Sequence, residues 1–146
     1  CEMAEGLKEL KELFELEDAN IRTYSPLTLA YIGDGIYDLV IRTILVKKAN
    51  CQVNRLHRKA STLVKAAAQS GMMEVIEPLL TEEERAVYKR GRNAHSATMA
   101  KHATMADYRR ATGFEALMGY LYLKEDFSRM LELIRAGLEK EDFKSD

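Results

Sequence analysis

The sequence predicts a single all-α domain with a sizeable buried core. The first observation is the composition, because 47% of the 146 residues are hydrophobic and 31% are charged, a balance typical of globular proteins. The second is that the chain has only 2 prolines and 8 glycines, so long irregular regions are not expected. The third is that helical periodicity of the apolar residues dominates throughout, and no stretch alternates like a β-strand.

The N-terminal half is expected to contain three helices. Four apolar residues share one face of a short amphipathic helix near the start of the chain: Leu7, Leu10, Phe14 and Leu16. Ser25 and Pro26 fit the start of a second helix, as N-cap and first-turn residue, and this helix runs to about Lys47. Asn50 fits the cap of a third helix, which is expected to end at Gly71.

The C-terminal half continues the helical pattern. The helices expected there cover residues 72–76, 81–91, 106–124 and 127–138. Pro78 is expected to stop the first of them, which is only a short turn. Thr81 and Glu84 have the spacing of a capping box for the second, which closes near Gly91. Residues 92–105 have no clean apolar period, so they are expected to form a surface loop or a weakly formed helix.

Two of the expected helices are apolar almost all round, at residues 27–46 and 114–123. A helix of that kind is expected to be buried on every side. A domain of this size has room for one such helix at its centre and rarely for two. An interface between two copies would cover the surplus apolar surface, so the pattern predicts a homodimer.

Membrane and secreted proteins are not favoured. The longest apolar stretch could span a bilayer, but it contains Asp34, Asp38 and Arg42, and each charge would cost about 3 kcal/mol or more at the centre of a membrane. The first eighteen residues are acidic and amphipathic, unlike a signal peptide. Cys1 and Cys51 are too few for a disulfide framework. We therefore expect a cytoplasmic protein with no membrane association.

The formal net charge of −1 conceals two basic blocks. Residues 47–65 and residues 85–110 each have a net charge of about +6 by direct count. Local charge rather than net charge attracts a polyanion, so these blocks favour a nucleic-acid partner. Two ordinary solvated helix faces would give the same pattern. The candidate RNA-binding residues are Arg55, Arg58, Lys59, Lys89, Arg90, Arg92 and Lys101.

Asp34 lies in the middle of the first apolar helix, between Gly33 and Gly35. An ionised carboxylate among apolar residues is costly unless it is paired or binds a metal ion. Glycine inside a helix costs about 1 kcal/mol relative to alanine, so the two glycines indicate that another helix or a ligand approaches closely. Asp38, four residues on, shares a helix face with Asp34. The alternative is that Asp34 simply pairs with an arginine such as Arg42.

Glu115 repeats this pattern in the second apolar helix, with Gly113 and Gly119 nearby. Two acids on two central helices, without an obvious lysine partner, suit a hard cation such as Mg²⁺. Phosphodiester hydrolysis with two metal ions needs carboxylates that hold the ions roughly 3.5–4 Å apart. Asp107, eight residues before Glu115, is a weaker candidate. The histidines show no ligand spacing, and the sequence has no glycine-rich phosphate loop and no catalytic Ser or Cys signature.

Four segments, in this order, resemble the ribonuclease III catalytic domain. Tyr31-Ile-Gly-Asp-Gly-Ile-Tyr and Thr112-Gly-Phe-Glu-Ala-Leu-Met-Gly-Tyr-Leu-Tyr-Leu resemble its two signature helices. Between them, Asn54-Arg-Leu-His-Arg-Lys-Ala and Lys89-Arg-Gly-Arg-Asn-Ala resemble the shorter branch called Mini-ribonuclease III. The resemblance covers residues 24–138 of a single domain at residues 1–146, in which residues 1–23 form an N-terminal helix and lead-in.

This resemblance implies an all-α homodimer that cuts double-stranded RNA with Mg²⁺, or alternatively Mn²⁺, and that lacks a separate double-stranded-RNA-binding domain. It implies that Asp34 and Glu115 are metal-binding and catalytic, with Asp38 as a further candidate ligand. It also implies a task in 23S ribosomal RNA maturation on the precursor RNA, with a ribosomal protein as a further candidate partner. Two acids of the larger enzymes are absent, since Ala30 and Thr112 stand at their positions.

We therefore expect a metal-dependent endoribonuclease that acts on structured RNA. The alternative is a catalytically silent RNA-binding or ribosome-assembly module on the same fold. A purely structural helical dimer would leave both basic blocks and both acids unexplained.

Overall fold

The computed structural model describes residues 2–94 and 104–139, and the all-α prediction is confirmed, because those residues form helices and no strand. The α-helices are α1 (Glu2–Leu13), α2 (Pro26–Lys48), α3 (Val53–Val64), α4 (Ala66–Ile76), α5 (Glu82–Asn93), α6 (Met105–Leu123) and α7 (Phe127–Glu139). Two short 3₁₀ helices lie at Ile21–Thr23 and Glu77–Leu79. None of the helices in these residues is both long and apolar enough to cross a lipid bilayer.

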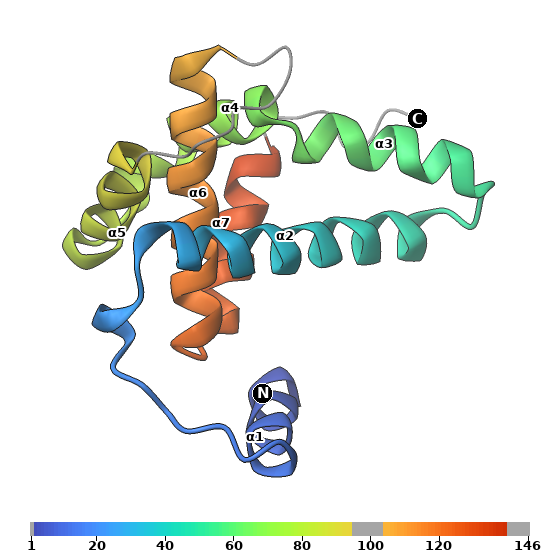
Figure 1. Cartoon of the computed structure of the whole chain (residues 1–146). Helices are drawn as coiled ribbons and strands as arrows, with labels where there is room; N and C mark the ends of the chain where they lie inside the picture. The colour runs from blue at the N-terminus through green and yellow to red at the C-terminus, as the bar shows by residue number, and fades with distance from the viewer. Residues whose placement is uncertain (1, 95–103, 140–146) are drawn as a thin grey trace.

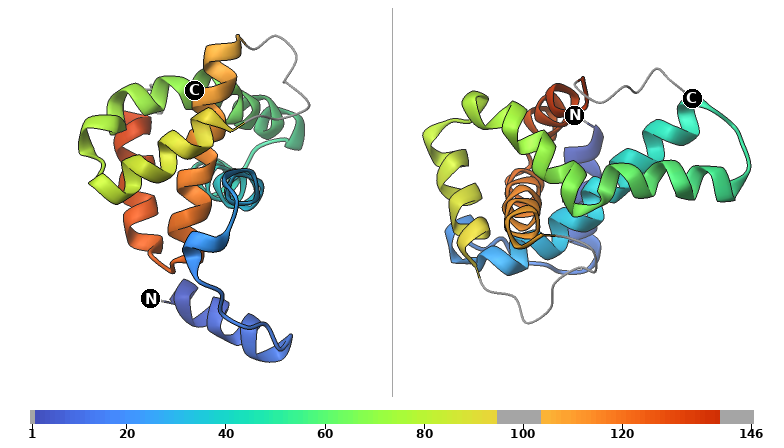
Figure 2. Two further views of the ribbon diagram at one scale, coloured as in Figure 1. Left: turned by 60° about the vertical axis from the view of Figure 1, so that its left-hand side comes forward. Right: turned by 90° about the horizontal axis from the view of Figure 1, so that it is seen from above.

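Helix α6 is the centre of the molecule. Figure 1 shows α2 crossing it transversely, with α5 to one side, and the view from above in Figure 2 shows the other helices around its axis. It packs against α2, α5, α4 and α7. Its middle is buried on every side, as the sequence predicts, and Phe114 and Leu117 have no exposed surface. The Tyr37 ring of α2 meets Phe114 edge-on, with 5.0 Å between the ring centroids.

Several predicted helix starts are confirmed in detail. The Ser25 hydroxyl accepts from the Thr28 backbone N–H, and Pro26 occupies the first turn of α2. Thr81 and Glu84 form the reciprocal capping box at the start of α5. Local sequence is sufficient at these positions, because both partners of each capping bond lie within one helical turn.

The predicted helix from Asn50 to Gly71 is wrong, since it consists of two helices. The chain turns at Lys65, which has an extended backbone, and Gly71 lies inside α4, which continues to Ile76. Side chains from elsewhere hold the freed carbonyls at this turn. The Tyr37 hydroxyl donates to the Leu63 carbonyl at 2.9 Å, and Nε2 of Gln69 donates to the Val64 carbonyl at 3.0 Å. These distant partners are absent from the local sequence pattern.

The N-terminal helix is shorter than its apolar pattern predicts. It ends at Leu13, so Phe14 and Leu16 lie beyond it, and both are exposed. The Lys11 ammonium forms ion pairs with Asp18 and with Glu125 at the end of α6, at 3.0 and 3.1 Å. The pair with Glu125 links α1 to the turn after α6, and ion pairs near the surface contribute little stability.

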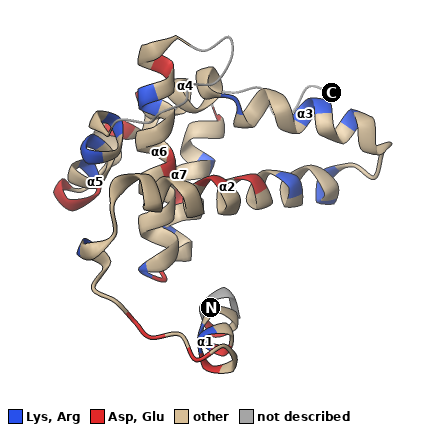
Figure 3. Ribbon diagram, in the orientation of Figure 1, with Lys and Arg blue, Asp and Glu red and all other residues tan. Residues whose placement is uncertain are grey.

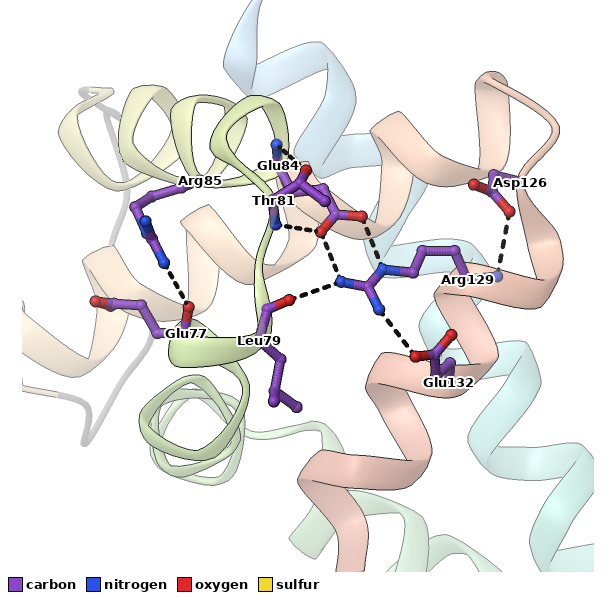
Figure 4. A network of polar contacts seen from close by, with 8 residues as sticks. All are labelled: Glu77, Leu79, Thr81, Glu84, Arg85, Asp126, Arg129 and Glu132. Atoms are coloured by element: carbon purple, nitrogen blue, oxygen red, sulfur yellow. Dashed lines mark hydrogen bonds and ion pairs between the residues drawn. The ribbon is translucent and has the colours of Figure 1, made fainter.

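Arg129 of α7 fastens that helix to the start of α5 (Figure 4). Its guanidinium donates to both Glu84 carboxylate oxygens at 2.9 Å and to the Leu79 carbonyl at 2.8 Å. The same Glu84 carboxylate caps the Thr81 backbone N–H at 2.9 Å. A charged pair with this many hydrogen bonds is geometrically specific, so it fixes where α5 begins.

Candidate active site

The site lies where α2 crosses α6 in direct backbone contact. A Cβ atom added at Gly33 would lie 1.8 Å from the Glu115 carbonyl oxygen, and one added at Gly119 would lie 1.9 Å from the Leu29 carbonyl oxygen. Glycine is therefore required at both positions, because any side chain would force the helices apart. The sequence predicted that a helix or a ligand approaches closely here, and at Gly33 it is a helix, α6. At Gly35 nothing lies within 4 Å, so this glycine faces open space.

The crossing brings the carboxyl groups of Asp34 and Glu115 together. Asp34 is exposed and Glu115 is partly buried. Burial, with hydrogen bonding and charge repulsion from Asp34, raises the pKa of Glu115 to about 8. The prediction that Asp34 is buried among apolar residues is wrong. It lies on the outer side of α2, and Glu115 is the carboxyl group that faces the interior.

The remaining candidate acids are not placed in the same way. Asp38 forms an ion pair with Arg42, with 2.8 Å between its Oδ2 and the arginine Nε. The partner of Arg42 is therefore Asp38, and not Asp34 as the alternative interpretation of the sequence had it. Ala30 and Thr112 are buried, and the Thr112 hydroxyl donates to the Tyr108 carbonyl at 3.0 Å. Within residues 2–94 and 104–139, no group of three or more His, Cys, Asp or Glu side chains is placed to hold a metal ion.

Gln69 is a third polar residue at the site, and sequence reasoning missed it. It lies on α4 and is only 1% exposed, although it is polar. Its side chain hydrogen-bonds Glu115 and thereby lowers the pKa of that carboxyl, against the larger effect of burial. Its Oε1 atom has no hydrogen-bond partner among the described residues. The available signal was a glutamine on the same helix face as Met72, Met73 and Ile76.

These groups fit a divalent cation. Among the described residues, those that shift the pKa of Glu115 are Asp34 and Gln69, and neither is basic. Carboxylate and amide oxygens are the ligands and acceptors that hard, hydrated cations prefer. Asp34 and Glu115 would hold the ion, and the buried side chain of Gln69 lies next to Glu115.

The predicted RNA-binding residues divide into two surfaces, on opposite sides of α6 (Figure 3). Arg55, Arg58 and Lys59 lie on α3, which packs against α2 and α4. Lys89, Arg90 and Arg92 lie on α5, which packs against α6 and α2. The crossing of α2 and α6 lies between these two helices.

Within the α5 surface, Lys89 and Arg90 are exposed. The Arg92 guanidinium lies over the Tyr88 ring, 5.7 Å from its centroid, and remains partly exposed. Lys101 and most of the predicted loop at 92–105 lie outside the described residues. Arg55 and Arg58 on α3 are exposed, and Lys59 is partly buried.

This chain is similar to known proteins over most of its length. The model of the Ribonuclease III domain matches residues 27–126. The Mini-ribonuclease 3 of Clostridium tetani is 46% identical over 122 residues, which is 83% of this chain and 81% of that protein. The Mini-ribonuclease 3 of Enterococcus faecalis is 49% identical over 78% of this chain and 88% of its own. That of Thermoanaerobacter is 43% identical over 92% and 93% of the two chains.

A solved structure is also similar. The crystal structure of a protein from Fusobacterium nucleatum superimposes with a TM-score of 0.75 and 30% sequence identity. The matched region covers 80% of this chain and 96% of that one. The Ribonuclease III match at residues 27–126 spans α6 and all but the first residue of α2, the two helices that carry the acidic pair.

Proposed function

Because the chain belongs to the ribonuclease III family and is an endoribonuclease of that type, we propose that it cuts double-stranded RNA with a divalent metal ion held by Asp34 and Glu115. The observation that carries the proposal is the carboxyl pair at the α2–α6 crossing. Glycines at 33 and 119 bring the two helices into backbone contact there. Mg²⁺ is the expected ion, with Mn²⁺ as the alternative.

The two acids have different tasks in this arrangement. Asp34 is exposed, so it meets the phosphate backbone of an incoming duplex directly. Glu115 lies deeper, and burial and Asp34 raise its pKa to about 8, so a bound cation would favour its charged form. A bound divalent ion supplies an activated water and stabilises the leaving oxygen in phosphodiester hydrolysis.

The physiological substrate we propose is precursor 23S ribosomal RNA in the cytoplasm, with a ribosomal protein as a further partner. The similarity to Mini-ribonuclease 3 proteins over most of the chain supports it. The two basic surfaces on α3 and α5 support a duplex ligand, because these helices lie on either side of the α2–α6 crossing (Figure 3). A-form RNA is recognised by its shape and backbone.

We propose a homodimer, because α2 retains an apolar stripe that nothing in the described chain covers. Tyr31 is 82% exposed, Leu39 54% and Val46 56%. The prediction that α2 is buried on every side is wrong for one chain, and a second copy would bury this stripe. The open space at Gly35 lies on the same face. Sedimentation at micromolar concentration checks this, and a well-folded monomer would contradict it.

The test of the activity is cleavage of a duplex RNA with and without Mg²⁺. We expect Asp34→Asn and Glu115→Gln each to abolish cutting while the fold and much of the RNA binding remain. Asp38→Asn is the matched control, because it removes the same charge from the same helix but from a carboxylate that Arg42 already pairs. Cleavage near the wild-type rate in either of the first two variants would remove that residue from the catalytic role.

The second candidate function is a catalytically silent RNA-binding module on the same fold. Ala30 and Thr112, which stand where the larger enzymes have acids, are the observation that favours it. Duplex RNA that binds tightly and stays intact in Mg²⁺ and in Mn²⁺ would establish this alternative.

A further inference from the structure

Gln69 is buried at the junction of three elements. Its backbone N–H donates to the Lys65 carbonyl at 3.1 Å, and its Nε2 donates to the Val64 carbonyl at 3.0 Å, both at the turn between α3 and α4. Because a carbonyl can only accept, the bond to Val64 fixes which end of the amide is nitrogen. The amide therefore has a defined orientation, set by backbone that belongs to another helix.

The second amide proton is available to Glu115, which the Gln69 side chain hydrogen-bonds across the α4–α6 contact. The charged form of the carboxyl accepts this bond. Glu115 is thus held from two directions, by the α2 backbone packed against its own carbonyl and by the α4 amide at its side chain. The Gln69 side chain is neutral, so its effect is to orient the Glu115 carboxyl group.

The Oε1 atom of Gln69 has no partner, and in the described part of the chain it is the one buried side-chain oxygen or nitrogen in that state. Buried polar atoms are nearly always hydrogen-bonded, because an unpartnered one is costly. Holding the α3–α4 turn uses only the Nε2 donor of Gln69, so that task leaves the buried oxygen unexplained. The free oxygen points instead to a ligand that brings a donor, such as a water molecule carried by a hydrated cation.

We propose that Gln69 is a positioning residue of the metal site, which orients the Glu115 carboxylate through Nε2 and accepts from a metal-bound water through Oε1. This inference rests on the proposed function, since it assumes that Asp34 and Glu115 hold a divalent ion. Residues that orient metal ligands in this way typically change metal affinity by about 10–100-fold when they are replaced.

The experiment measures Mn²⁺ binding to the full chain by electron paramagnetic resonance, without RNA, alongside the melting temperature in EDTA. Gln69→Met has a similar shape but neither donor nor acceptor. We expect it to weaken Mn²⁺ binding by about 10–100-fold, while metal-free duplex binding stays close to wild type. The melting temperature should also fall, because the Val64 carbonyl loses its donor. Gln69→Asn keeps the amide on a shorter side chain and should recover part of the affinity.

Tyr37→Phe is the matched control, because it removes the neighbouring hydrogen bond to the same α3–α4 turn, at Leu63, and leaves the Gln69 amide in place. It should lower the melting temperature and leave Mn²⁺ affinity unchanged. A purely structural role for Gln69 would give the same result in Gln69→Met, and that result would overturn the proposal.

Asp34→Asn separates the failure of this inference from the failure of the proposed function. If Asp34→Asn loses Mn²⁺ binding and both Gln69 variants keep it, the metal site stands and the role of Gln69 is wrong. If Asp34→Asn binds Mn²⁺ as tightly as wild type, the metal site itself is wrong. If Gln69→Met unfolds, the wild type provides the test. The NMR resonance of its Gln69 side-chain amide must shift when Mg²⁺ is added, and an unchanged resonance would overturn the proposal.

Discussion

Gly33 is the residue on which the geometry of the site depends most directly. Its added Cβ would overlap the Glu115 carbonyl oxygen at 1.8 Å, and the opposing atoms are backbone that cannot rotate away. We expect Gly33→Ala to lower the free energy of unfolding by about 3 kcal/mol, at the upper end for overpacked interiors. Cleavage should fall even where the variant is folded, because the helices that carry Asp34 and Glu115 must separate.

The control for this substitution is Gly71→Ala. Gly71 also lies inside a helix, α4, but nothing lies within 4 Å of its added Cβ. This change should raise the free energy of unfolding by about 0.5–1 kcal/mol, through helix propensity alone. Urea unfolding of both variants checks the pair, and equal effects would show that the crossing tolerates a side chain.

The sequence alone predicts some residues of the site and misses others. Glycines beside acids in two apolar helices were enough to predict that Asp34 and Glu115 belong together. The pattern could not show that Asp34 is exposed, because exposure depends on which side of α2 other helices cover. Gln69 was missed because its function depends on Val64 and Glu115, which are brought to it by the turn at Lys65 and the packing of α6.

At the scale of the helices, local signals succeeded where both partners lie in one turn, as in the capping box at Thr81. They failed at the α3–α4 turn, where Tyr37 of α2 supplies a hydrogen bond from 26 residues away. The position of a turn like this depends on tertiary contacts that a periodic pattern does not contain.

The bond between Arg129 and Glu84 makes the α5–α7 contact dependent on pH. Hydrogen bonding from Arg129 is the largest effect holding the pKa of Glu84 below its usual value of 4.5, against desolvation. A carboxyl with a lowered folded-state pKa stabilises the fold above its unfolded-state pKa. That stabilisation is lost as the pH falls below about 4.5 and through the lowered value.

We expect Arg129→Met to lower the free energy of unfolding by about 2–3 kcal/mol near pH 7, because Glu84 stays largely buried without its partner. The variant should also lose less stability than wild type between pH 4.5 and 3. Urea unfolding across this range measures both effects. Arg135→Met is the control, because the ion pair of Arg135 with Glu139 is exposed on the same helix. If the free energy of unfolding fell equally in wild type and in Arg129→Met between pH 4.5 and 3, the Arg129–Glu84 pair would not be the source of this pH dependence.

For the whole molecule, the placement of the basic surfaces determines how RNA is held. One surface lies on α3 and the other on α5, with the α2–α6 crossing between these helices (Figure 3). We therefore expect a duplex that lies across the crossing to contact both surfaces. Such contacts neutralise phosphates and release counterions, which makes binding steeply salt-dependent. Groups that bind the backbone at a distance from the reacting phosphate should affect affinity more than the chemical step.

The double variant Arg90→Ala with Arg92→Ala should therefore raise KM or Kd for duplex RNA more than it lowers kcat. The slope of log Kd against log salt should fall by roughly 0.7–0.9 for each phosphate that the variant no longer neutralises, taking the values for nucleic acids generally. The control is Lys8→Ala with Arg135→Ala, which removes the same charge from α1 and α7, away from both basic surfaces. If the Arg90 and Arg92 variant bound as tightly as this control at every salt concentration, the α5 surface would be an ordinary solvated helix face. Arg55→Ala with Arg58→Ala should weaken binding in the same way from the other side, because a duplex that spans the acids needs both surfaces.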